Sequence, residues 1–131
     1  MTPEELKQRT KAFGLRCIKV IEALPKSRTA DMLARQLVRS GTSAGANYRS
    51  ACRGRSGKDF AAKVDIAIEE ADESLYWLEV MVDAGLMSQK RLASLIKEGN
   101  EIVAILTATS RTTKRNLRRT ISNQKSQIRD T

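Results

Sequence analysis

The stretch from residue 35 to residue 79 constrains the fold more than any other part of the sequence. It reads RQLVRSGTSAGANYRSACRGRSGKDFAAKVDIAIEEADESLYWLE. Apolar residues recur at intervals of three and four on both sides of a glycine-rich corner, Arg53 to Lys58, and this spacing is typical of amphipathic helices. The stretch therefore predicts two long helices joined by a short turn, the first rich in arginine and the second rich in carboxylates.

The same spacing continues on both sides of this stretch, between clear start and stop signals. Thr2 and Pro3 suit a helix start, Pro25 ends the first helix, and Gly85 and Ser88 separate the third helix from the fourth. A chain of 131 residues has the size of one domain. We predict an all-α, antiparallel up-and-down four-helix bundle over residues 1–112. Its helices are expected at about residues 3–24, 29–53, 57–84 and 88–112.

Composition limits the classes of function. The chain has no histidine and two cysteines, which excludes the common nucleophile–histidine pairs and histidine-based zinc sites. No apolar run reaches the length of a membrane span, and the N-terminus lacks the apolar segment of a signal peptide. We therefore expect a cytoplasmic protein with reduced thiols and without a membrane partner.

Positive charge is concentrated at the C-terminus. The net charge is +9, and most of it lies after residue 110, which favours a polyanion such as nucleic acid as partner. Because the apolar pattern weakens here, residues 113–131 are expected to form a basic, frayed or disordered tail. The candidate nucleic-acid-binding residues are Arg111, Lys114, Arg115, Arg118, Arg119 and Lys125.

Two glycines interrupt the second predicted helix. Gly41 and Gly45 each cost about 1 kcal/mol relative to alanine inside a helix, so their presence suggests a close approach to another helix. A phosphate-binding loop is the alternative, but no strand precedes these glycines and no Gly-Lys-Ser/Thr follows them.

The third predicted helix has apolar residues on two faces. Ile66, Trp77 and Met81 lie nearly opposite its core face, with Glu70 and Glu73 among them. A second apolar face indicates a partner subunit, although Trp77 packed under a loop of its own chain is the alternative. Carboxylates at such an interface need cations, and the arginines of the second helix in an adjacent copy are candidates. They are Arg35, Arg39 and Arg49.

The carboxylates also raise the question of catalysis. Glu69-Glu70-x-Asp72-Glu73 looks like the acidic clusters of di-iron bundles, but those sites need Glu-x-x-His repeats. Nothing in the pattern forms a cleft for paired-carboxylate hydrolysis either. We therefore expect no enzyme, no cofactor, no metal and no small-molecule substrate.

Several separated motifs resemble one protein family. They are Arg39-Ser40-Gly41-Thr42-Ser43-Ala44-Gly45-Ala46-Asn47, Lys58-Asp59-Phe60, Ala67-Ile68-Glu69-Glu70-Ala71-Asp72-Glu73 and Tyr76-Trp77-Leu78-Glu79. In this order they are similar to the proteins encoded in intervening sequences of bacterial 23S ribosomal RNA genes, over roughly residues 10–105. The resemblance implies a four-helix bundle, a homopentamer and no assigned catalytic activity.

The architecture is also similar to the accessory variability proteins of diversity-generating retroelements, which are basic pentamers that bind reverse transcriptase and nucleic acid. One position departs from the family pattern, because many members carry a glutamate where this chain has Ser50 in Tyr48-Arg49-Ser50-Ala51. The basic C-terminal residues lie outside the resemblance.

Two functions follow as hypotheses. The first is a non-catalytic, oligomeric protein that binds nucleic acid, RNA or DNA, through its phosphate backbone without reading sequence. The second is a protein-interaction scaffold, or an accessory subunit of a polymerase or reverse transcriptase, that does not itself bind nucleic acid.

Overall fold

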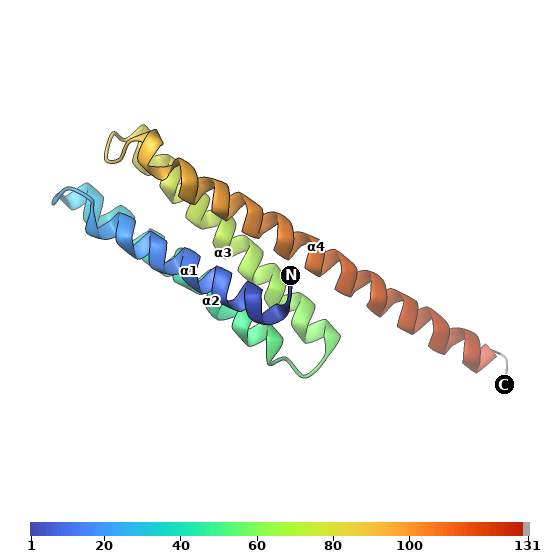
Figure 1. Ribbon diagram of the computed structural model, residues 1–131. Helices are drawn as coiled ribbons and strands as arrows, with labels where there is room; N and C mark the ends of the chain where they lie inside the picture. The colour runs from blue at the N-terminus through green and yellow to red at the C-terminus, as the bar shows by residue number, and fades with distance from the viewer. Residues whose placement is uncertain (130–131) are drawn as a thin grey trace.

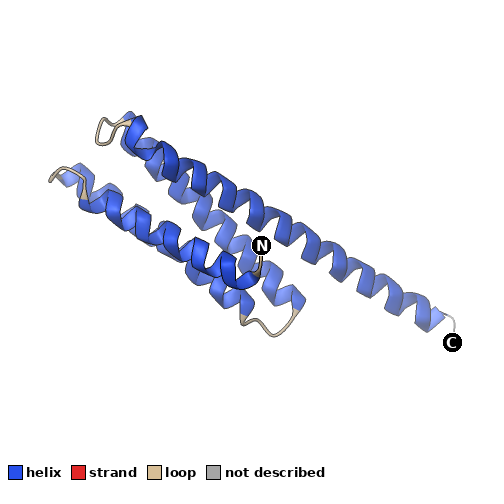
Figure 2. Cartoon of the chain, viewed as in Figure 1, coloured by secondary structure: helices blue, strands red, loops and turns tan. Residues whose placement is uncertain are grey.

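Four α-helices form an up-and-down bundle (Figure 1). The computed structural model describes residues 1–129, and every element in that range is helix, turn or loop (Figure 2). This confirms the predicted four-helix bundle. The helices are α1 (Pro3–Glu22), α2 (Arg28–Cys52), α3 (Gly57–Asp83) and α4 (Gln89–Arg129).

Each helix begins with the same kind of cap. A Ser or Thr hydroxyl just before the helix accepts a hydrogen bond from the backbone N–H three residues further on, which satisfies a donor that the helix itself leaves open. Gly85, at φ +75°, follows the end of α3 in the left-handed conformation that glycine adopts without strain. The four capping pairs are Thr2 with Glu5, Ser27 with Ala30, Ser56 with Asp59, and Ser88 with Arg91.

The core is a continuous apolar cluster that receives side chains from all four helices. Phe13, Leu37, Leu78 and Leu106 are among its fully buried members, and burying side chains of this size is the main force that holds the helices together. Cys17 is also buried, and the loss of solvation raises the pKa of its thiol to about 12. None of the helices within residues 1–129 is both long and apolar enough to cross a membrane.

Glycines allow α1 and α2 to approach closely, as the sequence predicted for Gly41 and Gly45. A Cβ added to Gly41 would lie 2.8 Å from the Cys17 sulfur, and one added to Gly45 would lie 3.2 Å from the backbone nitrogen of Lys11. Gly14 on α1 is equally tight, because its Cβ would lie 3.0 Å from the carbonyl oxygen of Gly41. The small residues are therefore required by the packing of the two backbones.

A polar seam joins α1 to α4. The Arg9 guanidinium donates two hydrogen bonds to the carboxylate of Glu98, at 2.7 and 2.6 Å, and a third to Glu101 at 2.8 Å. The Arg9 donors hold the pKa of Glu98 below its ordinary value. This arrangement fixes the register of the first helix against the last.

The fourth helix differs from the prediction. It was expected to end near residue 112, with residues 113–131 frayed or disordered, but α4 continues to Arg129 and projects beyond the bundle (Figure 1). The segment after residue 112 contains no glycine or proline to stop a helix. Residues 130 and 131, which belong to the predicted tail, lie outside the described part of the chain.

Candidate functional site

The projecting part of α4 carries its cations on one face. At about 100° per residue, the basic residues from Arg111 to Arg129 fall within a sector of about 140°. Leu117 and Ile121 lie to one side of that sector. The helix therefore presents a nearly continuous positive face, which a disordered tail would not have. We call this the α4 cation face; it comprises Arg111, Lys114, Arg115, Arg118, Arg119, Lys125 and Arg129.

Most of these cations are available to a ligand. Among residues 1–129, the side chains of five of the predicted nucleic-acid-binding residues are exposed and make no ion pair. They are Arg111, Arg115, Arg118, Arg119 and Lys125. The sixth, Lys114, is different, because its ammonium bonds to the carboxylate of Asp65 on α3 at 2.7 Å. Lys114 therefore holds α4 against α3, and its charge is less available to a ligand than that of the other five residues.

Two contacts anchor the start of the projecting helix. Asp65 accepts hydrogen bonds from Ser110, at 2.6 Å, and from Lys114. Partial burial opposes ionisation of Asp65, but these two donors outweigh it and hold its pKa below the ordinary value. One turn further on, Leu117 contacts the first residue of α3, since a Cβ on Gly57 would lie 3.0 Å from Leu117 Cδ2. Beyond Leu117, Ile121 is 51% exposed.

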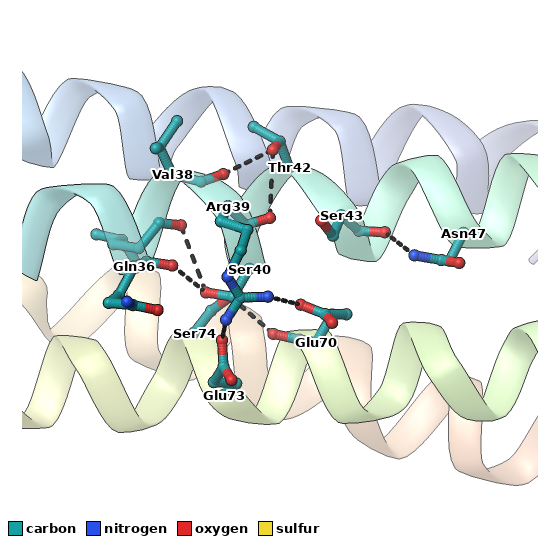
Figure 3. Close-up of polar contacts among 11 residues, drawn as sticks. Gln36, Val38, Arg39, Ser40, Thr42, Ser43, Asn47, Glu70, Glu73 and Ser74 are labelled. Carbon is teal, nitrogen blue, oxygen red and sulfur yellow. Dashed lines mark hydrogen bonds and ion pairs between the residues drawn. The ribbon is translucent and has the colours of Figure 1, made fainter.

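A second polar cluster joins α2 to α3 (Figure 3). The Arg39 guanidinium donates hydrogen bonds to Glu70, at 3.1 Å, and to Glu73. Beneath it, the buried hydroxyl of Ser74 donates to that of Ser40 at 2.9 Å. We expected Arg39 to reach these acids from an adjacent copy. The structure corrects this, because the three side chains pair within one chain.

The other predicted interface residues of α3 separate into buried and exposed positions. Met81 is 0% exposed and belongs to the core. Trp77 packs against the core cluster, and its Nε1–H is buried without an acceptor in the part of the chain that the structure describes. Only Ile66, at 42% exposure, lies on the outer surface. The prediction of a broad second apolar face is therefore wrong for Met81, and for Trp77, which is partly buried, it stays a prediction.

The reason is the position of the core face on α3. The large apolar residues Phe60 and Ile68 lie beside that face and are only partly buried. The most buried positions are instead small, such as Ala67 and Ser74, because α2 approaches there. The true face is rotated toward Met81, and no rule of helical spacing alone would have shown this.

The two remaining interface candidates lie apart from the acids of α3. Arg35 is exposed and Arg49 lines a groove between α1 and α2, and neither makes an ion pair within residues 1–129.

The described residues contain no group of three or more His, Cys, Asp or Glu side chains arranged to hold a metal ion.

The chain is similar to one protein family and to a solved structure. The model of the family described as 23S rRNA-intervening sequence protein matches residues 4–108. A crystal structure of a protein of unknown function from the S23 ribosomal protein family of Bacteroides thetaiotaomicron is 30% identical, with a TM-score of 0.79. The alignment covers 85% of this chain and 99% of that chain. No curated protein matches. The α4 cation face lies beyond the matched residues.

Proposed function

This chain belongs to the family of 23S rRNA-intervening sequence proteins, and from that premise we propose that it is a non-catalytic, oligomeric protein that binds the phosphate backbone of nucleic acid. The α4 cation face is the binding surface. The compartment we propose is the cytoplasm, where two free thiols remain reduced.

The observation that carries the proposal is the one-sided arrangement of unpaired cations on a continuous helix. Arginine forks match the oxygens of phosphate groups and bind them bidentately. Because the cations lie on one face and five of them make no ion pair within the described chain, a nucleic-acid backbone laid along the helix contacts several of them at once. Each such contact releases counterions from the nucleic acid and so adds to affinity at low salt.

The same surface lacks the groups that read bases. Single-stranded bases are recognised by stacking on aromatic side chains, and α4 contains no aromatic residue. Tyr76 on α3, at 56% exposure, is the one exposed aromatic side chain within residues 1–129. Binding should therefore depend weakly on sequence and strongly on salt.

Oligomerisation completes the proposal. A homopentamer, which the family resemblance implies, would carry five cation faces, and repeated weak contacts multiply into avidity. Val38 on α2 and Ile66 and Tyr76 on α3 are large apolar side chains left exposed by the single chain. They support an association surface, although a smaller one than the sequence suggested.

The direct test neutralises the α4 cation face without shortening the chain. Replacing Arg111, Arg115, Arg118, Arg119 and Lys125 by Gln should weaken binding to a labelled oligonucleotide by about a hundredfold or more at 50 mM salt. A matched control replaces five unpaired, exposed cations near the other end of the bundle by Gln, and should lose less than about tenfold. The control residues are Lys26, Arg28, Lys90, Arg91 and Lys97. Equal losses in the two variants would refute a specific role for α4.

A protein-interaction scaffold remains the second candidate. It is favoured by the exposed Ile66 and Tyr76, which lie beside unpaired carboxylates on α3 and could dock a partner subunit of another kind. Nuclease treatment separates the two functions. If the purified protein binds no oligonucleotide but retains a polymerase encoded nearby after nuclease digestion, the scaffold is the better account.

A further inference from the structure

A groove of about 440 Å³ lies between the outer surfaces of α1 and α2. Its floor is formed where the two helices nearly touch, at Gly14 and Gly45. Small residues there leave space above the backbones that larger side chains would fill. The groove is open to solvent and is lined by residues from both helices.

The groove is strongly basic. Four cations line it, Lys7 and Lys11 from α1 and Arg49 and Arg53 from α2, against one carboxylate, that of Glu4. Glu4 pairs with Lys7 at 3.2 Å, and this hydrogen bond holds the pKa of Glu4 below its ordinary value.

The other three cations have no such partner. Within residues 1–129, Lys11, Arg49 and Arg53 make no ion pair. Like charges that line one groove repel one another, and a bound anion would reduce that repulsion.

The spacing of the cations suits a chain of phosphates rather than a single anion. Lys7 and Lys11 are four residues apart, as are Arg49 and Arg53, so each pair follows its helix with a rise of about 6 Å. Leu15 and Ile18 supply apolar walls, and low-dielectric walls concentrate the field of the cations in the groove. No aromatic side chain lines it, which leaves phosphate and not base as the group that it recognises.

We propose that this groove is a second phosphate-binding site, which takes successive phosphate groups of a nucleic-acid strand. The inference rests on the proposed function and extends it to a surface that α4 does not form. In Figure 1 the N-terminus of α1 and the turn between α2 and α3 lie at the end of the bundle from which α4 projects. The groove and the α4 cation face are therefore near the same end of the molecule.

The test neutralises the three unpaired cations in the full-length protein. The variant carries Lys11→Gln, Arg49→Gln and Arg53→Gln, and the matched control carries Lys26→Gln, Lys90→Gln and Arg91→Gln. We expect the groove variant to bind a single-stranded oligonucleotide of about 20 nucleotides about tenfold more weakly than the control at 50 mM salt. Equal affinities would overturn the proposal.

Two competitors identify the form of phosphate. Inorganic phosphate and a nucleoside monophosphate, each added at millimolar concentration, should displace the oligonucleotide far less well than unlabelled oligonucleotide does. If either small anion competes as effectively per molecule, the groove is a small-anion site and the assignment to a nucleic-acid strand is wrong.

Stability and mass separate binding from a structural role. Because like charges repel, the groove variant should unfold at the same or a higher temperature than the unaltered protein at low salt. A lower unfolding temperature would show that the cations stabilise the fold, and would contradict the proposal. A smaller particle mass by light scattering would assign the groove to contact with a second copy, which contradicts it as well.

Failure of this inference is distinguishable from failure of the proposed function. If the α4 variant loses binding and the groove variant matches its control, only the assignment of the groove as a phosphate site is refuted. If the groove variant alone loses binding, the role of α4 in binding is refuted. If the unaltered protein binds no oligonucleotide, both the proposed function and the groove assignment are refuted.

Discussion

Single small residues determine how closely these helices pack. Gly41 lies against Cys17, Gly14 lies against the backbone of α2, and the hydroxyls of Ser40 and Ser74 meet in the buried contact between α2 and α3. The two glycines lower the intrinsic stability of their helices, and the close approach that they permit is the compensation. Larger side chains at these points should therefore act mainly through steric conflict.

Gly41→Ala tests this directly. Alanine favours the helix by about 1 kcal/mol, but its Cβ would lie 2.8 Å from the Cys17 sulfur, and overpacking of this kind costs about 1–3 kcal/mol. We expect a net loss of up to about 2 kcal/mol in the free energy of unfolding, measured by denaturant titration. Adding Cys17→Ala should recover part of the loss. A stabilised Gly41→Ala protein would contradict the close contact.

The bidentate pair of Arg9 and Glu98 gives a prediction with a pH signature. Glu98→Gln should lower the free energy of unfolding by about 1 kcal/mol near neutral pH. The pKa of Glu98 is lowered in the folded state, so its contribution is fully present above the ordinary carboxyl pKa and is lost as pH falls through the lowered value. The difference between the two proteins should therefore shrink below about pH 4. A difference that grows in acid would rule out this linkage.

At the scale of the element, α4 is one helix with two environments. Its first half packs in the bundle. The start of its second half is held by Asp65 and by the contact of Leu117 with Gly57, and the helix then projects into solvent. A solvated helix of this kind should open more readily than the core helices, because few buried contacts oppose its unfolding.

Asp65→Asn should loosen the projecting half of α4 without unfolding the bundle. The amide cannot form the ion pair with Lys114, so amide hydrogens after Ser110 should exchange faster while those of the core helices keep their protection. Hydrogen exchange read by mass spectrometry of peptides measures both regions at once. Asp72→Asn, at an exposed carboxylate of α3 without an ion pair in the described chain, is the control. Unchanged exchange after Ser110 would show that Asp65 is not an anchor.

Much of this element structure could be predicted from the sequence. The bundle, the approximate helix bounds and the role of Gly41 and Gly45 followed from spacing, caps and helix propensity. The end of α4 could not be predicted, because a polar helix that packs against no core has no repeating apolar residues to mark its length. Its one-sided cations were visible in the sequence only once the segment was known to be helical.

The predicted interface shows where sequence reasoning stopped. Glu70, Glu73 and Arg39 were correctly grouped as partners, but spacing along a helix does not say whether two residues meet within one chain or between two. Met81 was misplaced because small side chains such as Ala67 gave no signal that they lie at the centre of the core.

At the scale of the whole molecule, the protein is a folded bundle with positive surfaces near one end. The α4 cation face projects from the bundle, and the basic groove lies between α1 and α2. If several copies associate, these surfaces are repeated around the assembly. Nucleic acid would then be held by many phosphate contacts of modest strength.

The dependence of nucleic-acid affinity on salt tests this claim most directly. The logarithm of the association constant should fall linearly with the logarithm of salt concentration. Each phosphate contact on a single strand should add about 0.7 to the magnitude of that slope. Replacing the five unpaired cations of the α4 cation face by Gln should reduce the magnitude of the slope by about 3. Binding that ignores salt, or a slope that these substitutions leave unchanged, would contradict the account.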